Sequence, residues 1–203
     1  MSTPAEPGAT WASRPLGELL DVLGSRSAPV GGGSAAALAA AMAAALLERC
    51  ATEAGADGTR VRSANLRREL VQLVDTDAAA VVALMQGSAN GADQETTALL
   101  AEAASAPMRR LCERAHELGA LADRLERDGP SGLRGEARCA RLLARAAGEA
   151  ASAIIEINGG PGDAEPAVAG EAAAEVVDLA PSEPGSGPRW GMQSEELNAT
   201  LLT

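Results

Sequence analysis

The chain has 203 residues, a formal net charge of −11 at pH 7 and 46% hydrophobic residues. Its 17 basic residues are all arginine, and its only aromatic residues are Trp11 and Trp190. An acidic chain without lysine, and almost without aromatic side chains for base stacking, is poorly suited to binding nucleic acid. The hydrophobic fraction excludes a largely disordered chain and is sufficient for the core of one domain.

The sequence predicts no membrane-spanning segment, no signal peptide and no metal site. The apolar run 35–47 is shorter than the ~20 residues that a membrane-spanning helix needs. The first residues show no basic segment followed by an apolar one, so we expect a cytoplasmic protein without a membrane partner. Cys50, Cys112 and Cys139 are far apart and lack CxxC spacing, which predicts buried free thiols and no metal site.

The hydrophobic pattern predicts an all-α helical bundle with long, partly kinked helices. Strand signals are absent, because β-branched and aromatic residues are scarce and apolar–polar alternation never persists. Helices are predicted over 16–23, 34–53, 60–85, 93–127 and 133–157. Pro107 predicts a kink or break in the fourth helix, because proline removes a backbone hydrogen bond and clashes with the preceding turn.

One helical domain is expected over residues 14–179. An N-terminal tail over 1–13 precedes it, and a flexible Pro/Ser/Gly-rich tail over 180–203 follows. A weaker helix is predicted at 167–179, and a last helical turn at 195–202.

Alanine dominates the composition, with 47 residues. It has the highest helix propensity, and alanine-lined faces let helix backbones approach closely. The run 35–47 is apolar on every face, so a helix there must be buried all round. We therefore expect it at the centre of a bundle or in a subunit interface, and predict a homodimer with twofold symmetry.

Three consecutive glycines form the most informative motif. Gly31, Gly32 and Gly33 precede Ser34 at the start of a predicted helix. The free N–H groups and positive dipole end of a helix favour an anion or a polarised carbonyl group. Alternatively, the glycines allow close packing and Ser34 caps the helix. The motif is not a Walker loop, because no lysine follows the glycines. It is not a dinucleotide-binding motif either, because no predicted strand precedes them.

This motif resembles that of the cyclodeaminase/cyclohydrolase family. The family comprises the cyclodeaminase half of formiminotransferase-cyclodeaminase and bacterial methenyltetrahydrofolate cyclohydrolases. Segments 73–81, 102–111 and 150–158 also resemble family helices, so that the similarity covers about residues 16–177. The resemblance implies an all-helical, dimeric enzyme that acts on small one-carbon tetrahydrofolates without a metal or redox cofactor.

The resemblance also implies the chemistry. In cyclodeamination a folate nitrogen attacks a formimino carbon and ammonia leaves, whereas in cyclohydrolysis water adds to the methenyl carbon and opens the ring. Both reactions need proton transfer and a carboxylate near a cationic or tetrahedral centre. Gly31, Gly32, Gly33 and Ser34 would bind substrate, and Asp77 would transfer protons. On its residues alone, Asp77 is either a buried acid with a raised pKa or part of a solvated helix face.

A second acid depends on how the loop before the last predicted helix is aligned with the family's Ser-Asp pair. Anchoring on the Ile-Asn pair at 157–158 places Glu136 at the acidic position. Anchoring on Pro130 places Arg134 and Gly135 there, and the acid is lost. Glu136 otherwise favours its helix start through the dipole. Arg134 and Arg138 would bind a substrate carboxylate or are ordinary surface charges.

Departures from the family pattern keep three functions open. Val30 stands where the family usually has proline, and segment 54–60 lacks the family's lysines and tyrosine. The first function is a folate cyclodeaminase or cyclohydrolase. The second is a repurposed family member that catalyses a related C–N cyclisation, deamination or addition in a biosynthetic pathway. The third is a non-catalytic helical dimer that binds a ligand or partner.

Overall fold

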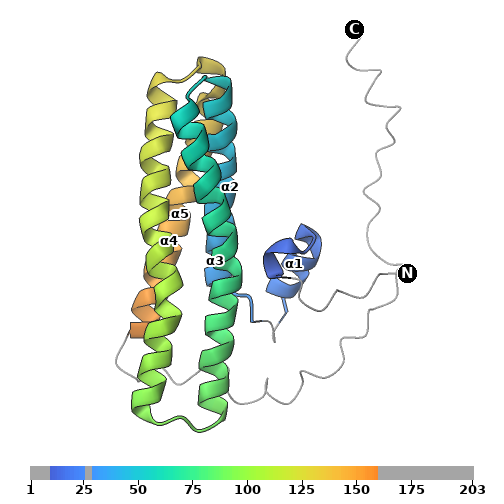
Figure 1. Cartoon of the computed structure of the whole chain (residues 1–203), viewed down its shortest axis with the longest axis vertical. Helices are drawn as coiled ribbons and strands as arrows, with labels where there is room; N and C mark the ends of the chain where they lie inside the picture. The colour runs from blue at the N-terminus through green and yellow to red at the C-terminus, as the bar shows by residue number, and fades with distance from the viewer. Residues whose placement is uncertain (1–9, 26–28, 160–203) are drawn as a thin grey trace, which may run out of the picture.

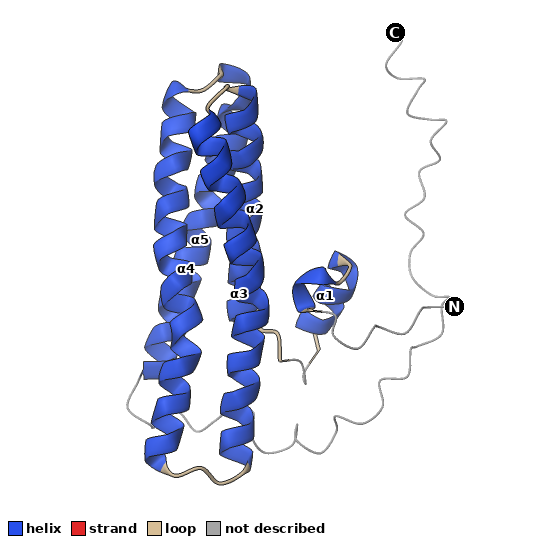
Figure 2. Ribbon diagram, viewed as in Figure 1, coloured by secondary structure: helices blue, strands red, loops and turns tan. Residues whose placement is uncertain are grey.

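A computed structural model describes residues 10–25 and 29–159, and all the secondary structure in these residues is helical (Figure 2). The prediction of an all-α protein is confirmed. The elements are η1 (Trp11–Ser13), α1 (Leu16–Leu23), α2 (Gly32–Glu53), α3 (Asp57–Ala89), α4 (Gln94–Asp128), η2 (Ser131–Leu133) and α5 (Arg134–Gly159). The features predicted at 167–179, 180–203 and 195–202 lie outside the described residues, as does most of the segment 1–13.

Helices α2 to α5 form an antiparallel bundle in which the chain alternates direction along one long axis (Figure 1). Helix α2 packs against α3, α4 and α5, and α4 likewise packs against the three other long helices. Helices α3 and α4 are longer, and they continue as a two-helix hairpin past the point where α2 begins.

Small side chains build the core. Alanine supplies about half of the buried hydrophobic residues, on every long helix. On α2 the buried alanines are Ala36, Ala37, Ala40, Ala41, Ala43, Ala44 and Ala51. Larger side chains fill the spaces between helices, among them Leu47, Leu66, Leu70, Met108, Leu111 and Leu118. Alanine-lined faces allow α2 to contact three neighbours at once. Within one copy of the chain the run 35–47 is not buried all round, because Ala35, Met42 and Ala45 are exposed.

Helix α4 runs without a break from Gln94 to Asp128 through Pro107, so the alternative of a break at this proline is wrong. Pro107 is buried in the bundle. Burial of the apolar face of α4 offsets the one backbone hydrogen bond that proline removes.

Two helices are long and apolar enough to cross a membrane by length and composition alone, namely α2 and α3. The sequence-based expectation considered only 35–47, whereas α2 has 22 residues and its most apolar window has a mean hydropathy of 1.4. Half of that window is buried inside the bundle. A core helix of a helical bundle passes this same test of length and composition.

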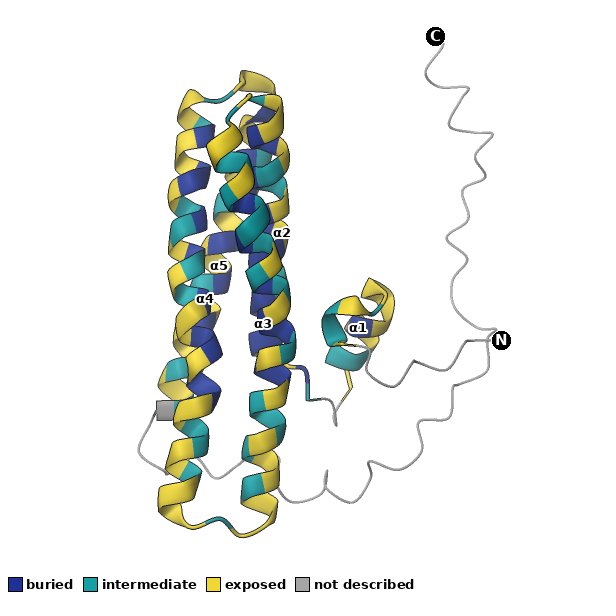
Figure 3. Ribbon diagram, viewed as in Figure 1, coloured by how far each residue is buried: buried dark blue, intermediate teal, exposed yellow. Residues whose placement is uncertain are grey.

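The free end of the α3–α4 hairpin is thinly packed. No residue from 79 to 103 is fully buried, although several are apolar (Figure 3). Gly87 lets the Leu100 side chain lie directly against the α3 backbone, because a Cβ at Gly87 would overlap Leu100 Cδ1. The hairpin therefore holds together by close contact between two helices rather than by a four-helix core.

The N-terminal segment is fastened to α3. The backbone N–H of Trp11 donates a hydrogen bond to the Asp75 carboxylate at 2.5 Å. The Arg14 guanidinium lies 4.4 Å from the centre of the Trp11 ring, within range of a cation–π interaction. Trp11–Ser13, at the end of the segment predicted to be a tail, thus form a 3-10 turn beside α3.

Enlarging a core alanine tests the close packing. Ala44 is fully buried on α2, so Ala44→Leu should lower the free energy of unfolding by about 1–3 kcal/mol through overpacking. Ala83→Leu is the matched control, because Ala83 is an exposed alanine within α3. Urea denaturation followed by circular dichroism measures both variants. Equal stability of the two variants would contradict this packing.

Candidate functional site

Ser34 and Asp77 meet in the interior where α2 begins. The Ser34 hydroxyl donates a 2.7 Å hydrogen bond to Asp77 Oδ2, and also lies 3.4 Å from the Val74 carbonyl oxygen. Ser34 is fully buried and Asp77 is 4% exposed. The structure therefore joins the glycine motif to the predicted acid, which are 43 residues apart in sequence. Asp77 lies in the interior and not on a solvated helix face.

Gly33 makes this contact possible. A Cβ at Gly33 would lie 2.7 Å from Asp77 Cγ and 2.8 Å from Oδ2, and would overlap Oδ1. Such separations are far inside van der Waals contact, so the carboxyl group rests directly on the Gly33 backbone. A side chain at this position would displace Asp77. The third glycine of the motif is thus required by packing between α2 and α3.

Burial controls the protonation of Asp77. Loss of solvation raises the pKa of the Asp77 carboxyl group above its ordinary value of 3.8. The hydrogen bonds from the Ser34 hydroxyl and backbone amide partly offset this rise. A carboxyl group with a raised pKa keeps its proton to higher pH than an ordinary aspartate, which suits it to give and take back a proton.

The start of α2 differs from the predicted cap. The helix begins at Gly32, so Ser34 lies inside the first turn, and no side chain caps the N-terminus at Gly31. The Ser34 hydroxyl bonds to Asp77 instead. Gly31 and Gly32 are exposed, and a Cβ at Gly32 would meet only Ile154 Cδ1, at 3.7 Å. The turn therefore presents exposed backbone on one side and the buried acid on the other.

Glu136 lies at the opposite end of α2. Burial raises the pKa of the Cys50 thiol, and the nearby negative charge of Glu136 raises it further. Ser34 and Cys50 are separated along α2 by about 24 Å, given a rise of 1.5 Å per residue. Within one copy of the chain, Glu136 and Asp77 therefore do not share a site.

The two predicted substrate-binding arginines are also distant from Asp77. Arg134 and Arg138 are exposed in the first turns of α5. Arg134 lines an open hollow of about 430 Å³ together with Asp123, Glu126 and Arg127 of α4. The structure thus brings together the glycine motif and Asp77, but not Glu136, Arg134 or Arg138.

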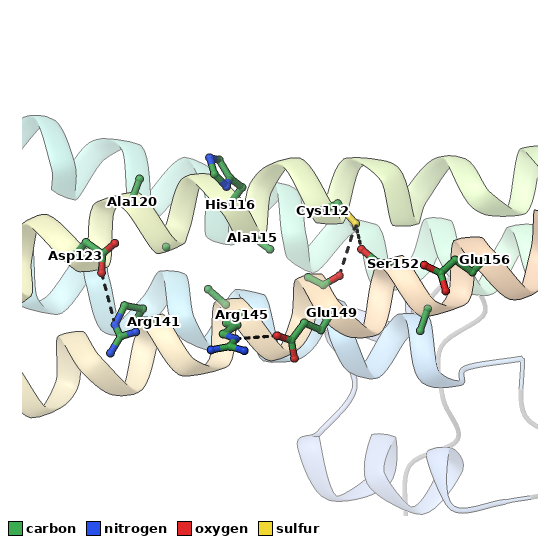
Figure 4. Close-up of a pocket in the computed structure, with 14 residues that line it drawn as sticks. Cys112, Ala115, His116, Ala120, Asp123, Arg141, Arg145, Glu149, Ser152 and Glu156 are labelled. Atoms are coloured by element: carbon green, nitrogen blue, oxygen red, sulfur yellow. Dashed lines mark hydrogen bonds and ion pairs between the residues drawn. The ribbon is translucent and has the colours of Figure 1, made fainter.

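A longer groove of about 660 Å³ runs between α4 and α5 (Figure 4). The Cys112 thiol lies 3.5 Å from the Ser152 hydroxyl and 3.7 Å from the Gly148 carbonyl oxygen. His116 is exposed on the α4 side, and an Arg145–Glu149 ion pair of 2.7 Å lines the α5 side. The sequence pattern did not predict this groove, because it forms only when small residues of two distant segments face each other. Asp77 lines neither hollow.

The cysteines are free, as predicted, but only Cys50 is buried. Cys112 is half-buried and Cys139 is exposed, so the expectation of three buried thiols is wrong. Helix α5 buries its small alanines against the bundle, and Cys139 lies on the other face. Within residues 10–25 and 29–159, no three His, Cys, Asp or Glu side chains converge as a metal site.

A single added methyl group tests the contact of Gly33 with Asp77. Gly33→Ala should lower the free energy of unfolding by about 1–3 kcal/mol, because the new Cβ collides with the carboxyl group. Gly32→Ala, one residue away in the same turn, should be nearly neutral. In the Asp77→Ala background most of the penalty of Gly33→Ala should disappear, as measured by a double-mutant cycle in urea. An unchanged penalty there would exclude this contact as its cause.

The raised pKa of Asp77 predicts a direction for the dependence of stability on pH. Below about pH 3.8, Asp77 is protonated in both the folded and the unfolded chain. As the pH rises, the unfolded chain ionises first, so the folded state loses stability until its own raised pKa is passed. Wild type should therefore gain stability relative to Asp77→Asn when the pH is lowered from 7 toward 4. Urea titrations at each pH measure the difference, and a relative loss on acidification would contradict the raised pKa.

Comparisons with known proteins identify the family and the fold of the chain. A family model described as formiminotransferase-cyclodeaminase matches residues 15–176, which confirms the resemblance seen in the sequence over about 16–177. A formiminotetrahydrofolate cyclodeaminase from Thermotoga maritima has a similar structure, with a TM-score of 0.67 and 20% sequence identity. The similarity covers 71% of this chain and 78% of that one, and it shows a shared fold. The comparison with curated protein sequences gave no match. Because the family model spans most of its length, the chain belongs to the formiminotransferase-cyclodeaminase family.

Proposed function

We propose that the chain catalyses closure or opening of a C–N bond at an amidine or iminium carbon, with a one-carbon tetrahydrofolate as substrate. One observation carries this proposal, namely the buried Asp77 held by Ser34 at the start of α2. Membership of a folate-related family supports the substrate class. We also propose that the protein is cytoplasmic, acts as a homodimer and needs no metal or redox cofactor.

Asp77 would move the proton that the reaction requires. In cyclodeamination, a folate nitrogen forms a bond to the formimino carbon, and the C–N bond to the departing nitrogen breaks. With the formimino group protonated as an amidinium, the protonated carboxyl group would give its proton to that nitrogen, which leaves as ammonia, and would regain a proton from the attacking nitrogen. In cyclohydrolysis, the ionised carboxylate would accept a proton from the water that adds to the methenyl carbon, and would return it to the folate nitrogen as the C–N bond breaks. The hydroxyl proton of the adduct goes to solvent as the formyl group forms.

Ser34 and the glycines would have supporting roles. The Ser34 hydroxyl donates to Asp77 Oδ2 and so fixes the orientation of the carboxyl group. The exposed backbone at Gly31 and Gly32, at the positive end of α2, would bind a carbonyl or anionic group of the substrate. Because Asp77 is 4% exposed, the proposal requires the side chains that cover it to move when substrate binds.

Burial of Asp77 also favours a second candidate function, a helical protein that binds a ligand without turnover. In that case the contact among Gly33, Ser34 and Asp77 serves only to hold α2 against α3. The absence of lysine from the chain supports a further variant of the proposal, in which the same carboxyl group acts on a different small imine or amine.

Replacing the proposed acid separates these functions. Asp77→Asn should lower the rate of methenyltetrahydrofolate hydrolysis, or of formiminotetrahydrofolate cyclodeamination, by about 10²–10⁴-fold, followed by absorbance. Asp75→Asn is the matched control, because Asp75 is two residues away on another face of α3 and contacts Trp11. Retained folate binding by wild type without turnover would favour the binding protein. Turnover that Asp77→Asn leaves unchanged would rule out Asp77 as the acid.

A further inference from the structure

The groove between α4 and α5 is long enough to hold another helix. It extends from Asp123 and Arg141 at one end to Glu156 at the other (Figure 4). Arg141 and Glu156 are fifteen residues apart on α5, which corresponds to about 22 Å at 1.5 Å per residue. Alanines and glycines of both helices line its floor, so a helix lying there could approach closely.

Gly119 leaves space in this groove that no described residue fills. It lies inside α4 and lines the groove, and a Cβ built on it would meet nothing within 4 Å. The glycine on the facing wall differs, because a Cβ at Gly148 would lie 3.3 Å from the Ala115 Cβ. Glycine destabilises a helix interior relative to alanine. Packing of α4 against α5 accounts for Gly148, whereas a further segment lying over the groove would account for Gly119.

The chain continues with a segment of suitable length directly after α5. Helix α5 ends at Gly159, three residues from Glu156, and 44 residues follow outside the described part. The sequence predicts a helix over 167–179, which would be about 20 Å long. Residues 160–166 remain to reverse the chain, a usual length for a connection between antiparallel helices. The matched family model extends to residue 176 and so includes most of this segment.

One face of the predicted helix is apolar. Val168, Ala172, Val176 and Leu179 recur at steps of three and four residues and therefore share a face. Val177 falls on the opposite face, at 100° per residue from its neighbour. A helix with this pattern can set small and branched apolar side chains on the floor of the groove.

The register of such a helix follows from the length of the connection. If the chain reverses over 160–166, Ala172 lies level with Ser152, whose hydroxyl is 3.5 Å from the Cys112 thiol. A segment antiparallel to α5 runs parallel to α4, so seven residues further on Leu179 lies level with Gly119. The largest side chain of the apolar face thus meets the unfilled space in the groove.

Charges along the segment favour this orientation. The exposed cations of α5 gather in its first half, at Arg134, Arg138, Arg141 and Arg145. The acids of the predicted helix lie toward its end, at Glu171, Glu175 and Asp178. Antiparallel docking sets Asp178 level with Arg145, and leaves the acid-free stretch 167–170 near Glu156, where a carboxylate favours a helix N-terminus. The parallel orientation would bring the acids toward Glu149 and Glu156.

We propose that residues 167–179 form a helix that docks in the groove between α4 and α5, antiparallel to α5, with Leu179 over Gly119. The occupant of the groove is therefore the chain's own C-terminal segment. Docking covers the half-buried Cys112 thiol and the small residues of the floor. The proposal rests on the groove and the segment alone, so it stands or falls independently of the proposed function.

Reactivity of Cys112 in the full-length chain tests the docking. Val176→Glu should speed alkylation of Cys112 by N-ethylmaleimide about 10-fold, because a charged side chain releases the segment and wild type is then docked about 10 times more often than free. Val177→Glu, the same change on the opposite face, is the matched control. Peptide mass mapping measures Cys112 and the exposed Cys139 in one sample, and Cys139 should react equally in all three proteins.

Equal rates at Cys112 in the three proteins, or a rise that Val177→Glu reproduces, would overturn the proposal. So would a rise at Cys139 of the same size as that at Cys112, because it would show a general loosening of α5 rather than release of the segment.

A disulfide tests the register directly. In a Cys139→Ser background, Ala172→Cys should form a disulfide with Cys112 within one chain under oxidation by copper phenanthroline, since docking brings the two residues level. Ala174→Cys is the matched control, because it is two residues away on another face and should remain reduced. Mass spectrometry without reductant measures both yields. Equal yields, no disulfide, or a disulfide that joins two chains would overturn docking of the segment on its own bundle.

Discussion

The hydrogen bond between Ser34 and Asp77 is the constraint on which the rest of this structure depends. It places a carboxyl group in the interior, where loss of solvation opposes ionisation, and it fixes the start of α2 against the middle of α3. The contact tolerates no side chain at Gly33. Three residues of two helices are therefore determined together, and a change in any one of them alters both the packing and the protonation of the acid. Stability and activity of variants at this point have to be measured side by side, since neither alone identifies the cause.

Alanine determines how the bundle surrounds this contact. Helices that present alanine can approach closely, so α2 contacts three neighbours while its buried side chains remain small. Because these side chains are small, a groove remains between α4 and α5, where alanines and glycines of the two helices line its walls. It also leaves Ala35, Met42 and Ala45 of α2 exposed. The core, the groove and these exposed residues thus follow from the same alanine-rich composition.

Much of the fold could be predicted from the sequence, because apolar residues that recur at steps of three and four residues predict long helices. The first predicted helix, 16–23, coincides with α1, and the other boundaries are shifted by a few residues, most at the two ends of α3. The rule that proline kinks or breaks a helix does not account for packing against other helices. Pro107 is buried in the bundle, and α4 continues through it. The exposure of Cys139 likewise depends on which face of α5 the bundle covers.

The candidate site was predictable only in part. The sequence indicates Ser34 and Asp77 as separate candidates, and nothing in their spacing of 43 residues indicates that they touch. The resemblance to a family suggested a common site, whereas the contact itself depends on the register of α2 against α3. For Glu136 the outcome is the opposite, because the resemblance groups it with Asp77 and the structure separates the two. That separation follows from the length of α2 rather than from any motif. The sequence predicts Gly33 as part of a turn, but its close contact with a carboxyl group depends on how α2 packs against α3.

Trp11 has an optical consequence. It is the only aromatic residue within the described part of the chain, and it lies beneath Arg14 on the short turn that Asp75 fastens to α3. The bundle itself contains no indole or phenol ring within those residues. In a Trp190→Ala variant, the fluorescence of Trp11 would report detachment of the N-terminal turn from α3. An emission change that precedes the loss of helical circular dichroism would thus reveal a local opening step that the dichroism signal alone conceals.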